Sequence, residues 1–381
     1  MLLATLVLTA CPTDDGDGGD GTTTVSTTAT TGPTSSGSAD DSTTADTTPG
    51  TGSGDSGSGS GSDSGDSGSG DSTGGPVVCG TPGELGMYAP PEGAAEGFVV
   101  DGTTVYLAST SGGLFVVDVS DPAAPSQLGQ YDFGSGNLAH RVANDGTTVY
   151  VGMRGAGWSV VDASDPGNII ELATDDTVDA QDVAVAGSTL LVADNNGLLS
   201  YDVTDPSTPT PLTVDLVLPG SSETIEVAGD VAFVASAGAG LSAVDISDPG
   251  ALMELSSLSI GNGAERLAVE GTTVYVAHSE GVSIVDATDS AMLTEVGSYV
   301  RERAWALDTD GTKVFVTGDD TASIQVPFLA VIDATDPAAV VELDVAADDY
   351  DDPHWLVFDA GLLYATVEDD DTLRIFDACP R

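Results

Sequence analysis

Side chains that can transfer protons or bind ligands recur at one position of a repeated pattern. Each lies six residues before a glycine in a predicted tight turn: Glu96, His140, Gln181, Glu223, Glu265, Trp305 and Trp355. Imidazole and carboxylate groups can act as acids and bases, and indole rings offer an apolar body with a polar edge. The pattern predicts a ring of such side chains, provided that the fold brings the seven positions together.

Most of the scarce basic residues fall beside these positions, at or just before a predicted first strand or in the loop after the second. The candidate ligand-binding residues are His140, Arg141, Arg154, Glu223, Glu265, Arg266, Arg301, Arg303, Trp305, His354 and Trp355. Such a mixed set suits a polar ligand with an apolar face, such as a sugar, or a protein loop. A purely structural role, in which these groups hold water and contact neighbouring units, is equally open.

The sequence carries no familiar catalytic motif. It lacks His-Glu-x-x-His, Cys-x-x-Cys and the phosphate-binding Gly-x-x-x-x-Gly-Lys loop, and no dinucleotide-binding glycine pattern opens a predicted helix. We therefore expect a protein that is not an enzyme, with no catalytic residues, no metal ligands and no cofactor. The alternative is a polysaccharide hydrolase or lyase that uses His140, His354 and Glu265.

Aspartates recur in the motif Asp-x-Ser/Thr-Asp-Pro, 13 of them in all. This spacing is typical of Asx turns, in which the carboxylate accepts backbone N–H bonds, so we expect a structural role. Two denser clusters, Asp348–Asp352 and Glu368–Asp371, could supply the oxygen ligands of Ca²⁺. Solvated acidic loops are the favoured interpretation, and a calcium-stabilised structural protein of the envelope stays an alternative.

From about Cys79 the chain consists of repeats. An apolar run that ends in aspartate occurs seven times, and the aspartates are 44, 40, 43, 41, 47 and 44 residues apart. This period fits one four-stranded propeller blade. Asp-Gly turns and alternating apolar residues predict the strands, and no segment shows a helical period. The sequence thus predicts an all-β, seven-bladed β-propeller over residues 79–381.

The unit Gly113–Pro122 reads Gly-Leu-Phe-Val-Val-Asp-Val-Ser-Asp-Pro and resembles the LVIVD repeat of bacterial surface and secreted proteins. The resemblance covers roughly residues 84–381 and recurs seven times, although Ser290 replaces the proline in the fifth unit. It implies a β-propeller and no single defined activity. Trp-Asp dipeptides and kelch double glycines are absent, which disfavours those propeller families.

The last repeat ends before its fourth strand, and a matching strand lies near the N-terminus. Residues 82–88 (Pro-Gly-Glu-Leu-Gly-Met-Tyr) match residues 125–131 (Pro-Ser-Gln-Leu-Gly-Gln-Tyr) position by position. We expect this N-terminal strand to pair with the last blade and close the ring, because an open edge strand promotes aggregation.

The same alignment predicts a Cys79–Cys379 disulfide. It places Cys79 at the position of Pro122 and Cys379 at that of Asp121, which are adjacent in a turn. Such a bond implies an oxidising compartment. Two unpaired thiols near the chain ends are the alternative.

The N-terminal part of the chain has a different composition. Residues 1–11 end in Leu-Thr-Ala-Cys, which resembles a bacterial lipobox, so we expect acylation of Cys11. The basic residues that usually precede such a run are absent, and we expect the true start to lie upstream. Residues 12–78 are nearly all Ser, Thr, Gly and Asp, which predicts a disordered stalk. The location expected is the outer membrane or cell surface of a bacterium.

The charge of the chain limits its partners. Its 61 acidic and 8 basic residues give a formal net charge of −53, of which −42 falls on the propeller. Nucleic acids are excluded as partners, and contact with a membrane is expected only through the lipid. We therefore expect a monomeric binding or interaction module whose partner is a protein or a glycan.

Overall fold

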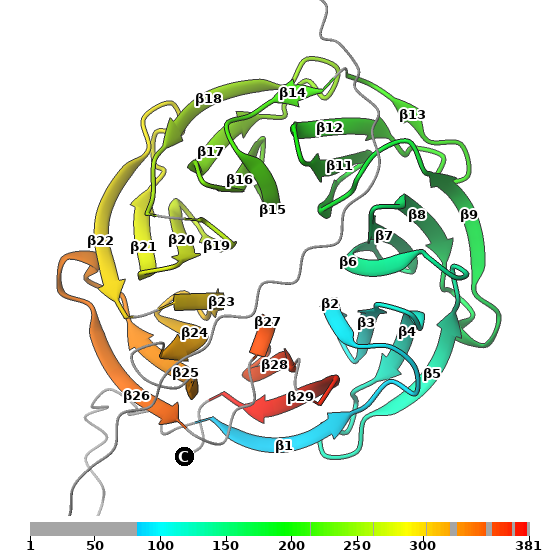
Figure 1. Cartoon of the computed structure of the whole chain (residues 1–381), viewed down its shortest axis with the longest axis horizontal. Coiled ribbons are helices and arrows are strands. Elements are labelled where there is room, and N and C mark those ends of the chain that lie inside the picture. Colours follow the sequence, from blue (N-terminus) through cyan, green and yellow to red (C-terminus); the bar gives the residue numbers. More distant parts are fainter. Residues whose placement is uncertain are drawn as a thin grey trace, which may run out of the picture. The chain divides into compact units, whose positions relative to one another are not determined.

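The computed structural model describes residues 82–213, 215–261, 263–301, 303–320, 326–347, 353–367 and 370–378. Within these ranges the chain forms seven antiparallel sheets and two short 3₁₀ helices, η1 (Pro166–Asn168) and η2 (Pro337–Ala339). The sheets are arranged in a ring, each with one strand at the centre (Figure 1). The predicted all-β, seven-bladed propeller is confirmed. No helix in the described part of the chain is long and apolar enough to cross a membrane.

Within a blade the chain runs from the innermost strand outward. Blade 1 contains β2 (Ala95–Asp101), β3 (Thr104–Ser109), β4 (Gly113–Asp118) and β5 (Ser126–Tyr131). Blade 2 contains β6 (Leu138–Asp145), β7 (Thr148–Arg154), β8 (Gly157–Asp162) and β9 (Ile170–Asp175). Blade 3 contains β10 (Asp182–Ala186), β11 (Thr189–Asp194), β12 (Gly197–Asp202) and two short outer strands, β13 (Thr210–Pro211) and β14 (Leu216–Val217).

The other four blades repeat this order, and only the last combines both ends of the propeller. Blade 4 contains β15 (Ser221–Ala228), β16 (Val231–Ala237), β17 (Gly240–Asp245) and β18 (Met253–Leu258). Blade 5 contains β19 (Arg266–Glu270), β20 (Thr273–His278), β21 (Gly281–Asp286) and β22 (Thr294–Val300). Blade 6 contains β23 (Arg303–Thr309), β24 (Lys313–Asp320), β25 (Val326–Asp333) and β26 (Val341–Ala347). Blade 7 contains β27 (Pro353–Asp359), β28 (Leu362–Val367), β29 (Thr372–Asp377) and β1 (Gly83–Tyr88).

The hairpin between the first two strands of a blade depends on one glycine. In blade 1, Asp101 pairs with Thr104, so the turn is made by Gly102 and Thr103, and Gly102 has a φ of +59°. A positive φ at the first central residue is what a type II′ turn requires, and glycine adopts it without strain. The predicted turn is present, and the glycine rather than the aspartate carries the positive φ.

The core lies between blades rather than within them. The described buried apolar residues form seven clusters, and each cluster joins two neighbouring blades. In one of them Leu114 and Val116 of β4 pack with Val149 and Val151 of β7. Each blade therefore needs its neighbours to remove its apolar faces from water.

The repeated aspartates form the predicted Asx turns. The Oδ1 atom of Asp118 accepts the N–H of Ser120 at 2.9 Å, and that of Asp121 accepts the N–H of Ala123 at 3.1 Å. The pair of bonds recurs in the following five blades. The backbone bond from Ser120 lowers the pKa of Asp118, so this carboxylate stays ionised as an acceptor. A structural role accounts for these residues.

The N-terminal strand closes the ring as predicted. Strand β1 pairs antiparallel with β29, with Gly83 opposite Asp377 and Tyr88 opposite Leu373 (Figure 1). The hydroxyl of Tyr88 donates a hydrogen bond to Oε1 of Gln127 at 3.1 Å, which links blade 7 to blade 1.

The observed register corrects the alignment proposed for Cys379. Asp377 lies opposite the first residue of β1, as Asp118 lies opposite the first residue of β5. Cys379 therefore corresponds to Ser120, one position earlier than the predicted Asp121. The alignment of its predicted partner, Cys79, with Pro122 is unchanged.

Several predictions concern parts of the chain outside the described residues. They are the lipobox of residues 1–11 with Cys11, the stalk of residues 12–78, Cys79, Cys379, the acidic cluster 348–352, and Glu368 and Asp369 of the second cluster. The pairing of the cysteines and the acylation of Cys11 stay predictions.

Candidate ligand-binding site

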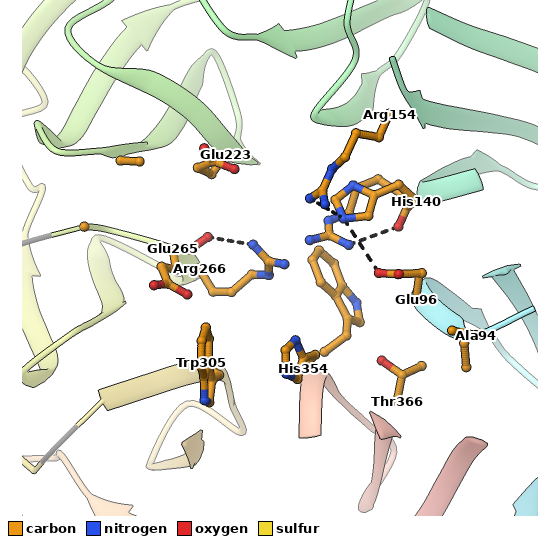
Figure 2. A pocket seen from close by; sticks show the side chains of 15 residues that line it. Ala94, Glu96, His140, Arg154, Glu223, Glu265, Arg266, Trp305, His354 and Thr366 are labelled. Atoms are coloured by element: carbon orange, nitrogen blue, oxygen red, sulfur yellow. Dashed lines mark hydrogen bonds and ion pairs between the residues drawn. The ribbon is translucent and has the colours of Figure 1, made fainter. Parts of the chain in front are cut away.

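A cavity of about 440 Å³ opens at one mouth of the central channel (Figure 2). Six of the seven predicted ring positions line it: Glu96, His140, Glu223, Glu265, Trp305 and Trp355. The seventh, Gln181, is buried, and its carbonyl oxygen contacts the ring of His140. The pattern of positions before the turn glycines thus marks one end of the channel.

β-Bulges near the start of several innermost strands turn some of these side chains in a different direction from their neighbours. The register of β6 with β7 shifts between Ala139 and Arg141, so His140 is the extra residue. Equivalent shifts occur at Glu223, Trp305 and His354. A bulge bends its strand and redirects the extra side chain, which explains how separate blades aim residues into one space.

In blade 7 the bulged residue is His354, and Trp355, which the spacing placed in the ring, is the residue that follows it. The turn there consists of Ala360 and Gly361, which both have positive φ, so the glycine stands one position later than in blade 1. Counted from the turn, Trp355 therefore corresponds to Arg141 and Arg266 rather than to His140.

These three equivalent residues meet inside the cavity. The guanidinium carbon of Arg141 lies 4.3 Å from the centre of the Trp355 ring, and that of Arg266 lies 4.8 Å from it. Nε1 of Trp355 donates to the carbonyl oxygen of Phe98 at 3.1 Å, which fixes the ring. Gly97 leaves room for the arrangement, because a Cβ there would lie 3.0 Å from Cδ of Arg141. The result is an indole held beside two cations.

Arg141 is charged although only 3% of its surface is exposed. Burial lowers the pKa of its guanidinium to about 10, while the negative charges of Asp182 and Glu96 oppose this shift. Its Nη1 atom donates to the carbonyl oxygen of His140 at 3.0 Å. At neutral pH the group thus places a positive charge beside the cavity.

His140 is neutral at physiological pH. Burial lowers the pKa of its ring to about 2, and the positive charges of Arg141 and Arg154 act in the same direction. Its Nε2 atom accepts a hydrogen bond from Arg154 at 2.8 Å, and the protonated Nδ1 faces the carbonyl oxygen of Gln181 at 3.3 Å. Because the ring is uncharged, its 3.7 Å contact with Glu96 is not an ion pair. Both nitrogens are engaged, which disfavours His140 as an acid or base.

Trp305 is covered on both faces of its indole. The guanidinium of Arg303 lies 3.4 Å from the ring centre, and the ring of His354 stacks at 5.0 Å with an interplanar angle of 18°. At these distances the two groups cannot share one face. Arg303 also pairs with Glu265 at 2.7 Å. The apolar platform that the sequence suggested for a sugar ring is therefore closed at Trp305.

Three carboxylates follow further along the channel. Asp182 accepts N–H bonds from Val183 and, across to blade 4, from Ile225, while Asp308 accepts from Phe358 of the next blade. Burial raises the pKa of Asp182 and that of Asp308 to about 6. Glu226 lines two smaller cavities of about 280 and 260 Å³. Glu226 is exposed where it lines them. Desolvation by the surrounding strands, with the negative charges of Asp308 and Asp182, raises its pKa to about 8.

These raised pKa values predict a pH dependence of stability. A carboxyl with a higher pKa in the folded state binds its proton more tightly when folded. The contribution of this group to the free energy of unfolding is fully present below its pKa in the unfolded chain, about 4. It is lost as the pH rises through its pKa in the folded protein. We expect the melting temperature to fall from about pH 4 to about pH 8.

The substitution Glu226→Gln isolates this effect from the repulsion of the whole acidic surface. It should raise the melting temperature at pH 8 and leave it nearly unchanged at about pH 4, because wild-type Glu226 is protonated when folded and largely protonated when unfolded at the lower pH. The exposed Glu280→Gln removes the same formal charge outside the channel and serves as the control. Equal effects of the two substitutions at pH 8, measured by calorimetry, would contradict the assignment.

Nine of the eleven predicted binding residues line the cavity, and Arg301 and Arg303 do not. Arg303 lies over Trp305, as described, and Arg301 pairs with Glu342 at 2.9 Å beside the ring of Phe328. The list of candidates omitted Thr366, which lines the cavity and lies opposite Trp355 in β28. Its position as the cross-strand partner of an inward-facing residue is the signal that could have found it.

No described group of three or more His, Cys, Asp or Glu residues is arranged to hold a metal ion. In the second acidic cluster Asp370 accepts from Thr372 and from Arg374, so its carboxylate is already engaged.

Fold and site together define a seven-bladed propeller with a polar cavity at one channel mouth. The chain belongs to the LVIVD repeat family, whose model matches residues 92–133, 136–177, 179–212, 219–259 and 261–300. These matches fall on blades 1 to 5, and the structure continues the repeat through blades 6 and 7.

Solved structures share the fold at low sequence identity. The WD40 propeller domain of Doa1 aligns with a TM-score of 0.60 and 11% identity over 77% of this chain and 96% of that domain. The propeller domain of Cps50 (Swd1) from Myceliophteria thermophila aligns with a TM-score of 0.60 and 11% identity, over 78% of this chain and 99% of that domain. The computationally designed Ika8 protein aligns with a TM-score of 0.56 and 11% identity, over 77% of this chain and 99% of that protein. Such likeness shows the fold alone. No curated protein matches the sequence significantly.

Proposed function

We propose that this protein is a non-enzymatic binding module whose ligand occupies the cavity at the channel mouth. The observation that carries the proposal is the convergence of residues from six blades on one cavity of about 440 Å³. That volume lies in the range of small-molecule sites, about 300–1,000 Å³. Binding rather than catalysis is favoured because His140 has both ring nitrogens engaged and Glu265 is paired with Arg303.

We also propose that the propeller is displayed at a bacterial cell envelope, where a lipid on Cys11 and the stalk of residues 12–78 would tether it. The lipobox-like sequence and the composition of the stalk support this location. Incorporation of a labelled fatty acid into the wild type and not into Cys11→Ser is the expected result. Equal labelling of both proteins would contradict the anchor.

A thermal-shift screen with sugars, organic acids and short peptides tests the binding site, because a ligand of the folded state raises the melting temperature. Ligands found in this way should bind less tightly to Glu223→Gln, which alters a lining residue that has no hydrogen bond or ion pair with any described residue. Glu280→Gln is the matched control outside the cavity. Binding that Glu223→Gln leaves unchanged, or conversion of the ligand into product, would contradict the proposal.

A further inference from the structure

The cavity gathers those arginines of the described residues that form no direct ion pair with a carboxylate. Of the seven described Lys and Arg side chains, four pair with carboxylates: Arg301, Arg303, Lys313 and Arg374. The other three are Arg141, Arg154 and Arg266, and all three line the cavity. Glu96, Glu223 and Glu265 line the same cavity, and the negative charges of Asp182, Glu96 and Glu223 act on Arg141. No described carboxylate, however, forms a direct ion pair with any of the three arginines.

These three arginines contact neutral groups instead. Arg154 donates to the imidazole of His140, and Arg266 donates to the carbonyl oxygen of Glu265 at 2.8 Å and to the hydroxyl of Thr224 at 3.3 Å. Arg141 donates to the carbonyl oxygen of His140.

The neutral contacts leave part of the hydrogen-bonding capacity unused. The Nε atoms of Arg141 and Arg266 are buried without a hydrogen-bond partner, as are those of the carboxylate-paired Arg301 and Arg303, so this feature is not specific to the cavity. A buried charge that no carboxylate contacts directly is only partly compensated by more distant acids, and the carboxylate of a ligand could contact it directly.

From this arrangement we infer that the cavity binds the carboxylate of an acidic sugar, an inference that rests on the proposed function. The planar fork of a guanidinium matches the two oxygens of a carboxylate. The carboxylate of Glu223 lines the same cavity without a described partner and can accept a bond from a ligand hydroxyl. A uronic acid offers both groups on one ring.

Neutral sugars fit the site less well. Protein sites for neutral sugars rely on an open aromatic face, and both faces of Trp305 are covered by Arg303 and His354. The recognition we infer is therefore electrostatic, and it depends on the three arginines more than on ring stacking.

Calorimetric titration of the full chain with glucuronate and with glucose tests the inference, because these sugars differ only in the carboxylate. Glucuronate should bind at least about 10-fold more tightly, since charge-assisted hydrogen bonds are roughly twice as strong as neutral ones. Arg154→Gln should weaken glucuronate binding by about 10-fold or more and leave glucose binding unchanged. Arg154 is exposed, so its replacement is compatible with folding. Arg266→Gln provides a second variant, and Arg301→Gln is the control for an arginine outside the cavity.

The outcomes separate the inference from the proposed function. Equal affinities for glucuronate and glucose, both reduced by Glu223→Gln, would overturn the acidic-sugar assignment and retain the binding site. Tighter binding of glutamate than of glucuronate would also overturn it, because glutamate offers an ammonium group in place of hydroxyls. Glucuronate binding that survives Arg154→Gln, Arg266→Gln and Glu223→Gln would overturn both.

Discussion

A chain that lacks residues 1–89 should melt about 10 °C or more below one that lacks only residues 1–81, and it should aggregate. The two chains differ by strand β1, which supplies the outer edge of blade 7. Its loss leaves the backbone of β29 unpaired and exposes the cluster that Tyr88 shares with Phe115. Several hydrogen bonds at about 0.5–1.5 kcal/mol each, with about 1.5–3 kcal/mol for the buried tyrosine, sum to about 5 kcal/mol or more.

Circular dichroism melts with sedimentation analysis measure both parts of this prediction. The chain that lacks residues 1–81 is the matched control, because it removes the whole segment before β1 and keeps Gly83–Tyr88. Equal melting temperatures for the two chains would show that the ring does not depend on its N-terminal strand.

Removal of Cys79 should have the second-largest effect. We expect a chain that lacks residues 1–78 to melt up to about 10 °C above one that lacks residues 1–81, because only the former can form the Cys79–Cys379 bond. The chain-entropy model gives roughly 5 kcal/mol for closing a loop of about 300 residues, as an upper figure. The pairing of Gly83 with Asp377 supports this bond, since each residue lies a few positions from one of the cysteines.

The chain that lacks residues 1–78 contains only two cysteines, which makes the test direct. Its mass should rise by two hydrogens on reduction, and the difference in melting temperature should vanish in the presence of reductant. Cys379→Ser in the same chain should reproduce the effect of reduction. Two titratable thiols in the unreduced, folded protein would contradict the disulfide.

The repeat architecture could be predicted because local patterns determine it. The turn glycines, the apolar runs and the Asx-turn aspartates each act within about ten residues, so the sequence displays them directly. The position of the closing strand was also predictable, since residues 82–88 match a complete outer strand elsewhere in the chain.

The site could be predicted only in part, because its geometry depends on features that the spacing does not show. The shifted turn at Ala360 and Gly361 moves the bulge to His354, and counting back from the glycine therefore selected Trp355. The lack of a direct ion pair for Arg141 and Arg266 among the described residues, and the ion pair of Arg303 with Glu265, depend on which blades face each other.

The pairing of β1 with β29 also governs the order in which the protein is made and completed. Ribosomes produce the N-terminal side of a chain first, so among the described strands β1 is synthesised first and its partner β29 last. The other six blades each pair strands that are close in the sequence, whereas β1 has to wait for β29. The ring can therefore close only after β29 has been synthesised, and until then β1 has no strand to pair with.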